Sequence, residues 1–511
     1  MKTKFYATTP IYYVNGAPHI GHAYTSIAAD VMARFKRLDG YDVRFLTGTD
    51  EHGQKVEKAA HDAGVDPQTF TDQISADFKA MADAMGVSYD DYIRTTEPRH
   101  KASTAELWKR IEASGDIYLG HYEGWYAVRD EAFHDESELT RRPDGSFVAP
   151  SGAPVEWVRE PSYFFRLSAF QDRLLKLYNN QPEFIAPSSR RSEVISFVKG
   201  GLRDLSISRT TFNWGIPVPD APGHVMYVWL DALNNYLTAC GFPDETGPLW
   251  RYWPADVHFV GKDIIRFHAV YWPAFLMAAG LSLPRRVSSN GWWLMDGEKM
   301  SKSLGNVVEP RKLAEIFGLD QLRYFLLREK PFGADGSLSH AAIISRINVD
   351  LANDLGNLSQ RLLSLIARNR GGVLPARGPW TEDDTGLLTA ADALPDLVRA
   401  NMDRQTFHEG LEEIWKVIRA ANGYIDRQAP WALNKTDKTR MGAVLRVLAD
   451  TLRVVATLLQ PVMPGSMARM LDQLGVPPDA RDFAALTTPL ADEITLPPPQ
   501  GVFPRYVEPA A

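Results

Sequence analysis

The chain has 511 residues, 45% of them hydrophobic, which is enough for roughly three or four globular domains with buried cores. Its formal net charge is −7 and 23% of its residues are charged, which excludes a globally basic nucleic-acid-binding protein and an acidic disordered tail. The single cysteine, Cys240, excludes an intramolecular disulfide and a multi-cysteine zinc site, and its apolar neighbours predict a buried thiol.

The N-terminal part has the pattern of a parallel α/β sheet. Residues 4–8 predict a strand, and apolar residues spaced by three and four predict a helix over residues 20–38 that ends before Gly40. The run DVRFLTG predicts a second buried strand, and DEHGQKVEKAAHDAG predicts a second helix. Because this alternation is typical of parallel sheets, we expect ligands at the carboxyl ends of the strands.

The pattern changes twice farther along the chain. From about residue 115 to 223, short strands and turns predict an insertion, and alternation of strand and helix resumes over residues 224–290. Residues 345–511 are predicted to be helical, with a proline-rich end that packs on the helices or frays. The predicted fold class is therefore an α/β domain split by an insertion and followed by an all-α domain.

The stretch TPIYYVNGAPHIGHAY places His19 and His22 at the start of the first predicted helix. Taken alone, such a pair is more often solvated or structural. In a functional site, the helix amides, the positive end of the dipole and two imidazoles would bind a phosphate chain and stabilise charge on a reacting phosphoryl group. Gly21 would let a flat ligand such as adenine approach the helix backbone.

The stretch DGEKMSKSLGN carries Lys299 and Lys302 among small and flexible residues. A charged loop of this kind is usually solvated surface. Its functional interpretation is a mobile arm whose ammonium groups clamp the β- and γ-phosphates of a nucleotide. The two motifs together, in this order on an α/β scaffold, are far more specific than either alone.

With these motifs the chain resembles the class I aminoacyl-tRNA synthetases, most closely the methionyl-tRNA synthetase family, over essentially its whole length. The resemblance implies a Rossmann-like parallel-sheet catalytic domain split by a connective insertion, a stem-contact region after the lysine loop, and an all-α anticodon-binding helical bundle with a C-terminal tail. The implied boundaries are 1–114, 115–223, 224–290, 291–344 and 345–511. The segments that carry it are NGAPHIGHAY, FLTGTDEHG, SYFFRLS, YVWLDAL, FVGKDIIRFHAVYWPA, GEKMSKSLGN and LRYFLLRE.

The resemblance also implies a methionine site. A thioether has no charge, so its pocket must be apolar and polarizable, and aromatic rings offer favourable contacts to sulfur. Asp50 matches the residue that binds the α-ammonium group, a role compatible with capping the helix that follows. Without the resemblance, the aromatic segments would be ordinary core. The matching pocket positions are Ile11, Tyr13, Val228, Trp229, Ala232, Tyr236, Phe267, His268 and Trp272.

For ATP, the resemblance implies His19, His22, Lys299 and Lys302 as catalytic residues. Asp263 is suited to ribose hydroxyls at a strand end, and Arg209 matches an arginine that touches substrate or phosphate. Magnesium would be held largely by phosphate oxygens and water, with no metal site on the protein itself. The full set of matching positions is Asn15, His19, Gly21, His22, Gly261, Lys262, Asp263, Ile264, Lys299, Ser301 and Lys302.

Four positions match the residues that read the methionine anticodon. Asn357 and Arg361 lie one helical turn apart, and Pro430 and Trp431 follow a predicted helix break. An exposed tryptophan can stack on an unpaired base, and asparagine with arginine can read base edges. The alternative for Trp431 is packing between helices.

The implied enzyme is a methionine–tRNA ligase for translation initiation and elongation. It would activate L-methionine with ATP to methionyl-adenylate and pyrophosphate, and then transfer methionine to the 3′ end of tRNA(Met). The insertion lacks the cysteine pairs of the zinc knuckle found in many relatives, so we expect no structural zinc. The chain ends before a dimerising domain could follow, which favours a monomer.

The sequence has neither a signal-peptide core nor a run of about 18 apolar residues, so we expect a soluble cytoplasmic protein without membrane or DNA partners. Three alternatives remain open. Synthetases for leucine, isoleucine and valine usually need a larger insertion. A small-molecule nucleotidyltransferase would lack the helical domain, and an inactive tRNA-binding relative would not need His19, His22, Lys299 and Lys302.

Overall fold

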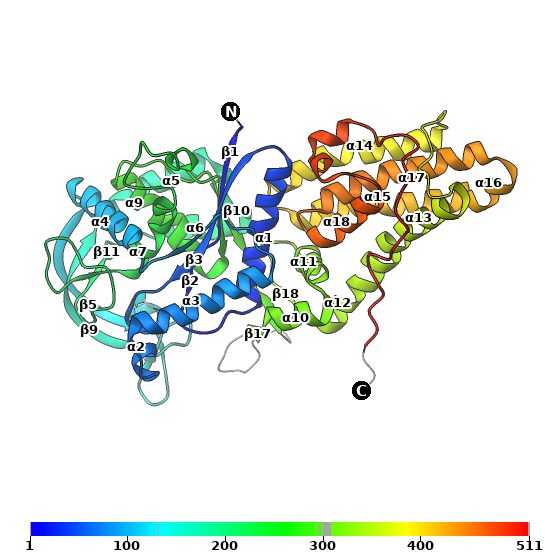
Figure 1. Ribbon diagram of the computed structural model, residues 1–511. Coiled ribbons are helices and arrows are strands. Elements are labelled where there is room, and N and C mark those ends of the chain that lie inside the picture. Colours follow the sequence, from blue (N-terminus) through cyan, green and yellow to red (C-terminus); the bar gives the residue numbers. More distant parts are fainter. Residues whose placement is uncertain (1, 131, 296–297, 300–307, 509–511) are drawn as a thin grey trace. The chain divides into compact units, whose positions relative to one another are not determined.

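The computed structural model describes residues 2–130, 132–295, 298–299 and 308–508 (Figure 1). The chain divides into two compact units, and each is described by itself. We call them the sheet unit, Lys4–Pro18 and Arg44–Asn290, and the helical unit, Met1–Thr3, His19–Val43 and Gly291–Ala511. The division into five domains stays a prediction.

A largely parallel sheet of seven strands forms the centre of the sheet unit. The order is β10-β15-β14-β1-β3-β2, and β4 also pairs with β3. The pairings of β10 with β15, β15 with β14, β14 with β1, and β3 with β2 and β4 are parallel. The strands are β1 (Lys4–Thr8), β2 (Tyr12–Tyr13), β3 (Asp42–Asp50), β4 (Asp91–Arg94), β10 (Ile185–Ala186), β14 (Val257–Gly261) and β15 (Val287–Asn290).

Helices that precede or follow these strands in the chain contribute side chains to the same buried core. The predicted strands over residues 4–8 and 42–48 are confirmed, and the second extends to Asp50. Cys240 is buried as predicted, and burial raises the pKa of its thiol to about 12. The helices are α2 (Gln54–Asp62), α3 (Pro67–Ala84), α4 (Pro98–Ala113), α7 (Val228–Leu233), α8 (Asn235–Thr238) and α9 (Trp272–Ala278).

The predicted pattern of short strands and turns is only partly right for residues 115–223. A four-stranded antiparallel sheet is built on two long strands, β5 (Ile117–Ala127) and β9 (Glu156–Phe165). Two helices follow, α5 (Gln171–Asn180) and α6 (Ser188–Lys199). Glycines interrupt the alternation along β5, and α6 buries only two of its twelve residues, so neither pattern is strong in sequence. The shorter strands are β6 (Ala132–His134), β7 (Thr140–Arg141), β8 (Phe147–Val148), β11 (Leu205–Ser206), β12 (Ser208–Arg209) and β13 (Val225–Met226).

The helical unit begins with α1 (Ile20–Leu38), which has the predicted bounds. A small sheet of β16 (Trp293–Met295), β17 (Glu298–Lys299) and β18 (Gly336–Ser337) precedes the long helices seen in Figure 1. The proline-rich end packs on the helices, with Gln500 N–H donating to Gln473 Oε1 of the helix Pro464–Gln473 at 2.6 Å. The later helices are α10 (Pro310–Phe317), α11 (Leu319–Arg328), α12 (His340–Arg346), α13 (Asn357–Arg370), α14 (Glu382–Asp403), α15 (Phe407–Gln428), α16 (Pro430–Thr436), α17 (Lys438–Leu459) and α18 (Pro464–Gln473).

The predicted helical character after residue 345 is therefore confirmed. None of the helices in the described part of the chain is long and apolar enough to cross a membrane.

A buried ion pair fixes α1 within the helical unit. Arg323 Nη2 of α11 lies 2.6 Å from Asp30 Oδ2 of α1, and neither side chain is exposed. Arg323 also donates to the carbonyls of Pro461 and Val462, each at 2.9 Å, in the turn between α17 and α18. A fully desolvated guanidinium needs such partners for each of its N–H groups. One side chain thus joins α1, α11 and the end of the bundle.

Replacing Arg323 with methionine should destabilise the helical unit by about 3 kcal/mol, because it leaves a buried carboxylate with fewer partners. Urea unfolding of the variant measures this. The matched control is Arg419→Met, because Arg419 is 47% exposed in its ion pair with Glu412, and exposed pairs contribute about 1 kcal/mol or less. Equal losses in the two variants would contradict the role of Arg323.

Candidate functional site

The two histidines of the first motif cap the helix that they begin. His19 Nδ1 accepts from Gly21 N–H at 3.1 Å, and His22 Nδ1 accepts from His19 N–H at 3.1 Å, which forms a reciprocal capping box. The rings lie 3.7 Å apart between centroids. Because Nδ1 of each ring is an acceptor, the proton of each neutral ring is on Nε2. The helix start therefore presents two imidazole donors beside its own amides.

Gly21 has a local role that the sequence did not reveal. A Cβ at this position would lie 2.9 Å from Cε1 of the His19 ring. The glycine is thus needed for the capping position of His19. The close approach of adenine to Gly21 stays a prediction.

The described residues on both sides of the lysine motif contact α1 within the helical unit. Before the motif, the Trp293 ring packs edge-on against Tyr24 at 5.8 Å. After it, Val308 O accepts from Ile20 N–H at 3.1 Å. Lys299 belongs to β17, and Ser301 and Lys302 lie outside the described residues. The structure therefore brings both flanks of the second motif to the helix that carries the first.

Asp50 ends β3 in the sheet unit, where it pairs with Tyr13 of β2. Val14 N–H donates to Asp50 O at 3.2 Å, so residues 11–14 follow the end of β3. Lys55 Nζ lies 5.4 Å from the centre of the Tyr13 ring. The structure thus brings Tyr13 and Asp50 together at the carboxyl end of the sheet, as the sequence predicted.

The predicted methionine pocket is a cluster of packed aromatic rings. Trp229 of α7 stacks on Phe267 with centroids 3.7 Å apart and planes at 5°. Tyr236 of α8 contacts both His268 and Trp272, with centroids at 5.8 and 6.0 Å. Val228 and Ala232 lie on α7 and are buried. Ile11 and Tyr13 pack against the same hydrophobic core.

His268 is an uncharged member of this cluster. Its Nδ1 faces Ile264 O at 3.0 Å, and a carbonyl can only accept, so the ring proton is on Nδ1. Nε2 is then an acceptor and Tyr236 OH donates to it at 2.7 Å. Burial lowers the pKa of His268 to about 4. Burial also raises the pKa of Tyr236, with Asp50 among the smaller contributors. The pair is therefore neutral at physiological pH.

Gly261, Lys262, Asp263 and Ile264 follow β14 directly. Lys262–Ile264 forms one 3-10 turn, and the chain continues in helix through the π-helical turn Phe267–Tyr271 to α9. A Cβ at Gly261 would lie 2.6 Å from Asp263 Oδ1, so the glycine admits that carboxylate. Asn15 and Asp263 are exposed, while Gly261, Lys262 and Ile264 are half-buried. Because Ile264 O accepts a hydrogen bond from His268 Nδ1, this turn is linked to the aromatic cluster.

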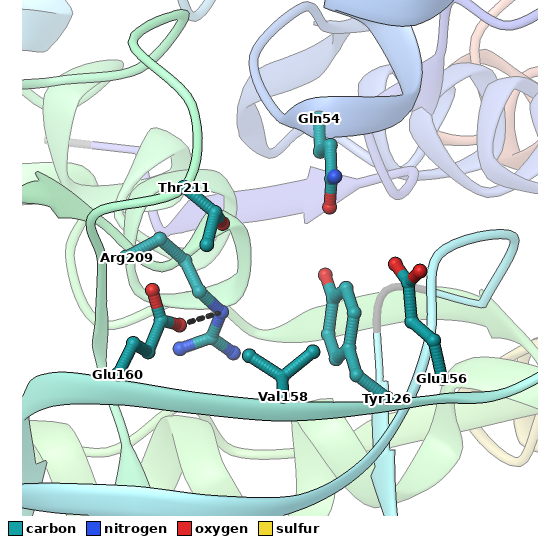
Figure 2. Close-up of a pocket in the computed structure, with 7 residues that line it drawn as sticks. All are labelled: Gln54, Tyr126, Glu156, Val158, Glu160, Arg209 and Thr211. Carbon is teal, nitrogen blue, oxygen red and sulfur yellow. Dashed lines mark ion pairs between the residues drawn. The ribbon is translucent and has the colours of Figure 1, made fainter.

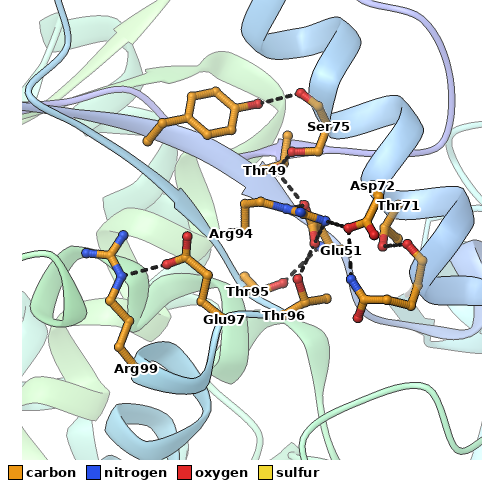
Figure 3. Close-up of polar contacts among 12 residues, drawn as sticks. Thr49, Glu51, Thr71, Asp72, Ser75, Arg94, Thr95, Thr96, Glu97 and Arg99 are labelled. Carbon is orange, nitrogen blue, oxygen red and sulfur yellow. Dashed lines mark hydrogen bonds and ion pairs between the residues drawn. The ribbon is translucent and has the colours of Figure 1, made fainter.

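Sequence reasoning missed the buried residue next to Asp50. The Glu51 carboxylate accepts from Arg94 at 2.7 and 2.9 Å and from Thr49 Oγ1 at 2.7 Å, as Figure 3 shows. Its amide donates to Thr95 Oγ1 at 2.9 Å, and its carbonyl accepts from Trp214 Nε1 at 2.6 Å. Glu51 is fully buried. The sequence signal for this buried carboxylate was a glutamate directly after a buried strand.

His52, His100 and Asp231 form a second cluster that the sequence did not predict. Asp231 Oδ2 lies 2.6 Å from His52 Nδ1, and Asp231 Oδ1 lies 2.7 Å from His100 Nε2. All three side chains are at most 2% exposed. An aspartate within the apolar run VWLDAL was the available signal.

Arg209 lines a hollow with an empty volume of about 260 Å³, shown in Figure 2 with Gln54, Tyr126 and Thr211. Its Nη1 donates to Ser206 Oγ at 2.9 Å and Ser208 O at 2.7 Å. Its Nε lies 3.9 Å from Glu160 Oε1, and its guanidinium lies 4.6 Å from the Tyr227 ring centre. Contact of Arg209 with substrate stays a prediction.

The four positions predicted to read the anticodon lie on two helices of the bundle. Asn357 is exposed and Arg361 half-buried on α13, while Pro430 is buried and begins α16 after Ala429 at φ 44°. Trp431 is 46% exposed, and the Arg361 guanidinium lies 5.5 Å from its ring centre. The predicted helix break is confirmed. Nearly half of the Trp431 side chain is exposed, and a role for it in base stacking stays a prediction.

No group of three or more histidine, cysteine, aspartate or glutamate side chains that could hold a metal ion occurs among the described residues.

Two family models match the chain: "tRNA synthetases class I (M)" over residues 5–363 and "Anticodon binding domain of methionyl tRNA ligase" over residues 374–507. The parallel sheet, the histidine helix start and the helical bundle thus define a class I aminoacyl-tRNA synthetase. Methionine–tRNA ligases of Mesorhizobium japonicum and Brucella suis are 58% and 57% identical to it, each over 99% of the chain and 98% and 99% of the relative.

A solved structure of Mycobacterium tuberculosis methionyl-tRNA synthetase in complex with methionyl-adenylate is 55% identical, with a TM-score of 0.97 over 98% of this chain and 100% of that one. A ligand-free form of that enzyme gives a TM-score of 0.91 at 52% identity over 100% and 99%. The chain belongs to the methionyl-tRNA synthetase family. The predicted fold class, family and ligase activity are confirmed, and the alternative enzyme classes are excluded.

The low pKa of His268 predicts how stability depends on pH. The unfolded chain binds a proton at this residue near pH 6.5, whereas the folded protein binds it only near pH 4. Stability should therefore fall as pH drops through this window, by at most about 1.4 kcal/mol per pH unit for this residue. In His268→Gln, unfolding measured from pH 7 to 4.5 should show a shallower slope. An NMR titration of His268 near pH 6.5 in the folded protein would contradict the assignment.

Proposed function

We propose that the aromatic cluster around Tyr236 and His268 binds the methionine side chain and that Asp50 binds its ammonium group. The observation that carries this assignment is a cluster of uncharged aromatic rings with the Asp50 carboxylate near it at a strand end. A thioether loses little hydration on burial and gains ring contacts of about 0.3–1.5 kcal/mol each. A longer cationic or anionic side chain would be left desolvated without a counter-charge. Ile11, Tyr13, Val228, Trp229, Ala232, Phe267 and Trp272 complete the proposed pocket.

Two sets of residues are proposed to contact ATP, and each is described by itself. In the sheet unit, Asn15, Gly261, Lys262 and Ile264 accompany Asp263, whose exposed carboxylate suits ribose hydroxyls. In the helical unit, the Nε2–H groups of His19 and His22 are proposed to stabilise phosphate charge together with the helix amides beside Gly21. Lys299, Ser301 and Lys302 are proposed to supply the further cationic contacts to the phosphates.

ATP is proposed to enter as its magnesium complex. Magnesium would be held largely by phosphate oxygens and water. When bound, magnesium supplies neutralising charge to the triphosphate. Structural zinc is not part of the proposal.

The proposed reaction needs no protein nucleophile. The methionine carboxylate attacks the α-phosphorus of ATP and pyrophosphate leaves, and the ribose hydroxyl at the 3′ end of tRNA(Met) then attacks the mixed anhydride and releases AMP. Positioning by Asp50 and the aromatic cluster and charge stabilisation by the histidines supply the catalysis.

The anticodon is proposed to contact α13 and the start of α16. Trp431 stacks on an unpaired base, Pro430 fixes the break that exposes it, and Asn357 and Arg361 read base edges. We further propose a cytoplasmic monomer, with no DNA or membrane partner.

Exchange of pyrophosphate into ATP, measured with each amino acid in turn, tests the substrate. Exchange should depend on methionine. Asp50→Asn should raise the KM for methionine roughly tenfold or more while changing the KM for ATP less than about twofold, because one charge-assisted bond to the ammonium group is weakened. Exchange supported equally by leucine or valine would defeat the proposal.

The separate roles proposed for the histidine helix start and for the anticodon-binding helices can be tested with two variants. His22→Ala should lower exchange by roughly 100-fold, because it removes a donor to the reacting phosphates and an acceptor of the capping box. Trp431→Ala should leave exchange intact and raise the KM for tRNA about tenfold, from lost stacking of about 1–3 kcal/mol.

Leu397→Ala is the matched control for Trp431, since Leu397 on α14 is 45% exposed and has no proposed role. It should change neither measurement. Loss of exchange to the same extent in His22→Ala and Trp431→Ala would contradict the assignment.

A further inference from the structure

We infer that the buried cluster of His52, Asp231 and His100 fixes the distance between the Asp50 carboxylate and the side-chain pocket on α7 and α8, and so sets the amino-acid chain length that the site accepts. The inference rests on the proposed methionine site. His52 and Asp231 are positioning residues in it, since they act through Asp50 and through α7.

One end of the cluster is tied to Asp50. His52 lies two residues after Asp50, and its Nδ1 faces Asp231 Oδ2 at 2.6 Å. Between them, Glu51 is held to β4 by Arg94 and to the turn after β4 by Thr96 Oγ1 at 2.5 Å. After β3, the Glu51 side chain thus bonds to Arg94 of β4, and the His52 side chain bonds to Asp231 of α7. The backbone that carries Asp50 cannot shift without breaking one of these buried contacts.

The other end of the cluster is tied to the side-chain pocket. Asp231 lies on α7, the six-residue helix that also carries Val228, Trp229 and Ala232. His100 of α4 contacts Asp231 Oδ1 at 2.7 Å and Thr238 Oγ1 at 3.1 Å, and so reaches both α7 and α8.

A second set of hydrogen bonds joins α4 to the same helices. Asn234 Nδ2 donates to Ser103 Oγ at 2.8 Å and to Thr104 Oγ1 at 3.0 Å. The pocket helices and α4 therefore move as one body.

The cluster holds a carboxylate where all three side chains are buried. A buried carboxylate is costly unless it is paired and hydrogen-bonded. A carboxylate can only accept, so both facing imidazole nitrogens carry protons. Although burial alone would raise the pKa of Asp231, the two histidines lower it to about 2, so the ion persists throughout the physiological range. Its short directional bonds fix a distance, which an apolar contact between the same elements would not do.

Trp214 reinforces this arrangement from the return of the insertion. Its ring packs edge-on against His52 at 5.5 Å, and its carbonyl accepts from Gly53 N–H at 2.9 Å. The segment from Asp50 to Gly53 is thus held on three sides, by β4, by α7 and by the insertion.

The test compares pyrophosphate exchange with three thioether amino acids of different length: methionine, S-methylcysteine with one methylene fewer, and ethionine with one more. One methylene ordinarily changes kcat/KM by about 10- to 200-fold. His52→Leu should raise the KM for methionine about tenfold. The ratio of kcat/KM for methionine to that for S-methylcysteine or for ethionine should fall about tenfold for at least one of the two. The KM for ATP should change less than about twofold.

The conservative variant His52→Asn supplies the readout that a merely structural role would not move. Its side-chain amide can place a donor near the position of Nδ1, so the length preference should return toward that of the wild type. His100→Gln serves the same purpose at Nε2, against His100→Leu. If His52→Leu does not fold, the His100 pair carries the test.

Asp204→Asn is the matched control. It neutralises another carboxylate of the sheet unit, bound to Tyr118 OH at 2.8 Å and Ser168 Oγ at 2.6 Å in the insertion. This change should leave the length preference unaltered.

Unchanged length preference in folded His52→Leu and His100→Leu would overturn the inference. Asp50→Asn separates this failure from failure of the methionine site itself. If Asp50→Asn raises the KM for methionine while the leucine variants do not alter the length preference, only the positioning role is wrong. If Asp50→Asn has no effect on that KM, the site is wrong as well.

Discussion

A negative charge buried in the sheet unit constrains the elements that carry the proposed methionine site. Asp231 is fully buried and remains ionised because His52 and His100 each place a ring nitrogen within 2.7 Å of it. These residues come from the segment after β3, from α4 and from α7. A charge with such partners cannot be relocated without a large desolvation cost, so the three elements are held in one arrangement. The position of α7, and with it Trp229 and Ala232, follows from that arrangement.

The titratable rings of the aromatic cluster at the proposed methionine site are uncharged. His268 and Tyr236 could each ionise, but burial shifts their pKa values away from neutrality, and the hydrogen bond between them satisfies both polar groups. His258, which stacks on Tyr236 at 4.1 Å, is likewise neutral because burial lowers its pKa. A pocket of neutral polarizable rings beside one carboxylate matches a zwitterionic amino acid with an uncharged side chain. The contrast between Asp231 and His268 shows that local partners, and not burial alone, decide the charge state.

In the helical unit, α1 carries the proposed catalytic histidines and is held in place by two ion pairs. Its first turn is closed by two imidazoles, its middle is held by the Asp30–Arg323 pair, and its end is held by Arg399, which donates to Asp39 at 2.8 Å. The capping box also orients the histidines, because using Nδ1 as acceptor leaves Nε2 to donate. A structural role and a proposed catalytic role therefore belong to different atoms of the same rings. Both flanks of the lysine motif contact the same helix, through Trp293 and Val308.

The sequence by itself determined what local spacing encodes: the strands over residues 4–8 and 42–48, the helix start at His19 and the break before Trp431. Periodicity and capping depend on neighbours a few residues away, which one chain displays directly. Only the tertiary structure decided the partners of the buried charges. His52 and Asp231 are 179 residues apart and His100 and Asp231 are 131 apart, and no periodic pattern relates such positions. The sequence also did not predict α6 or the length of β5. Neither segment has a strong apolar periodicity, because glycines interrupt β5 and α6 buries only two residues. Which polar side chain can be buried depends on which partner the fold brings to it.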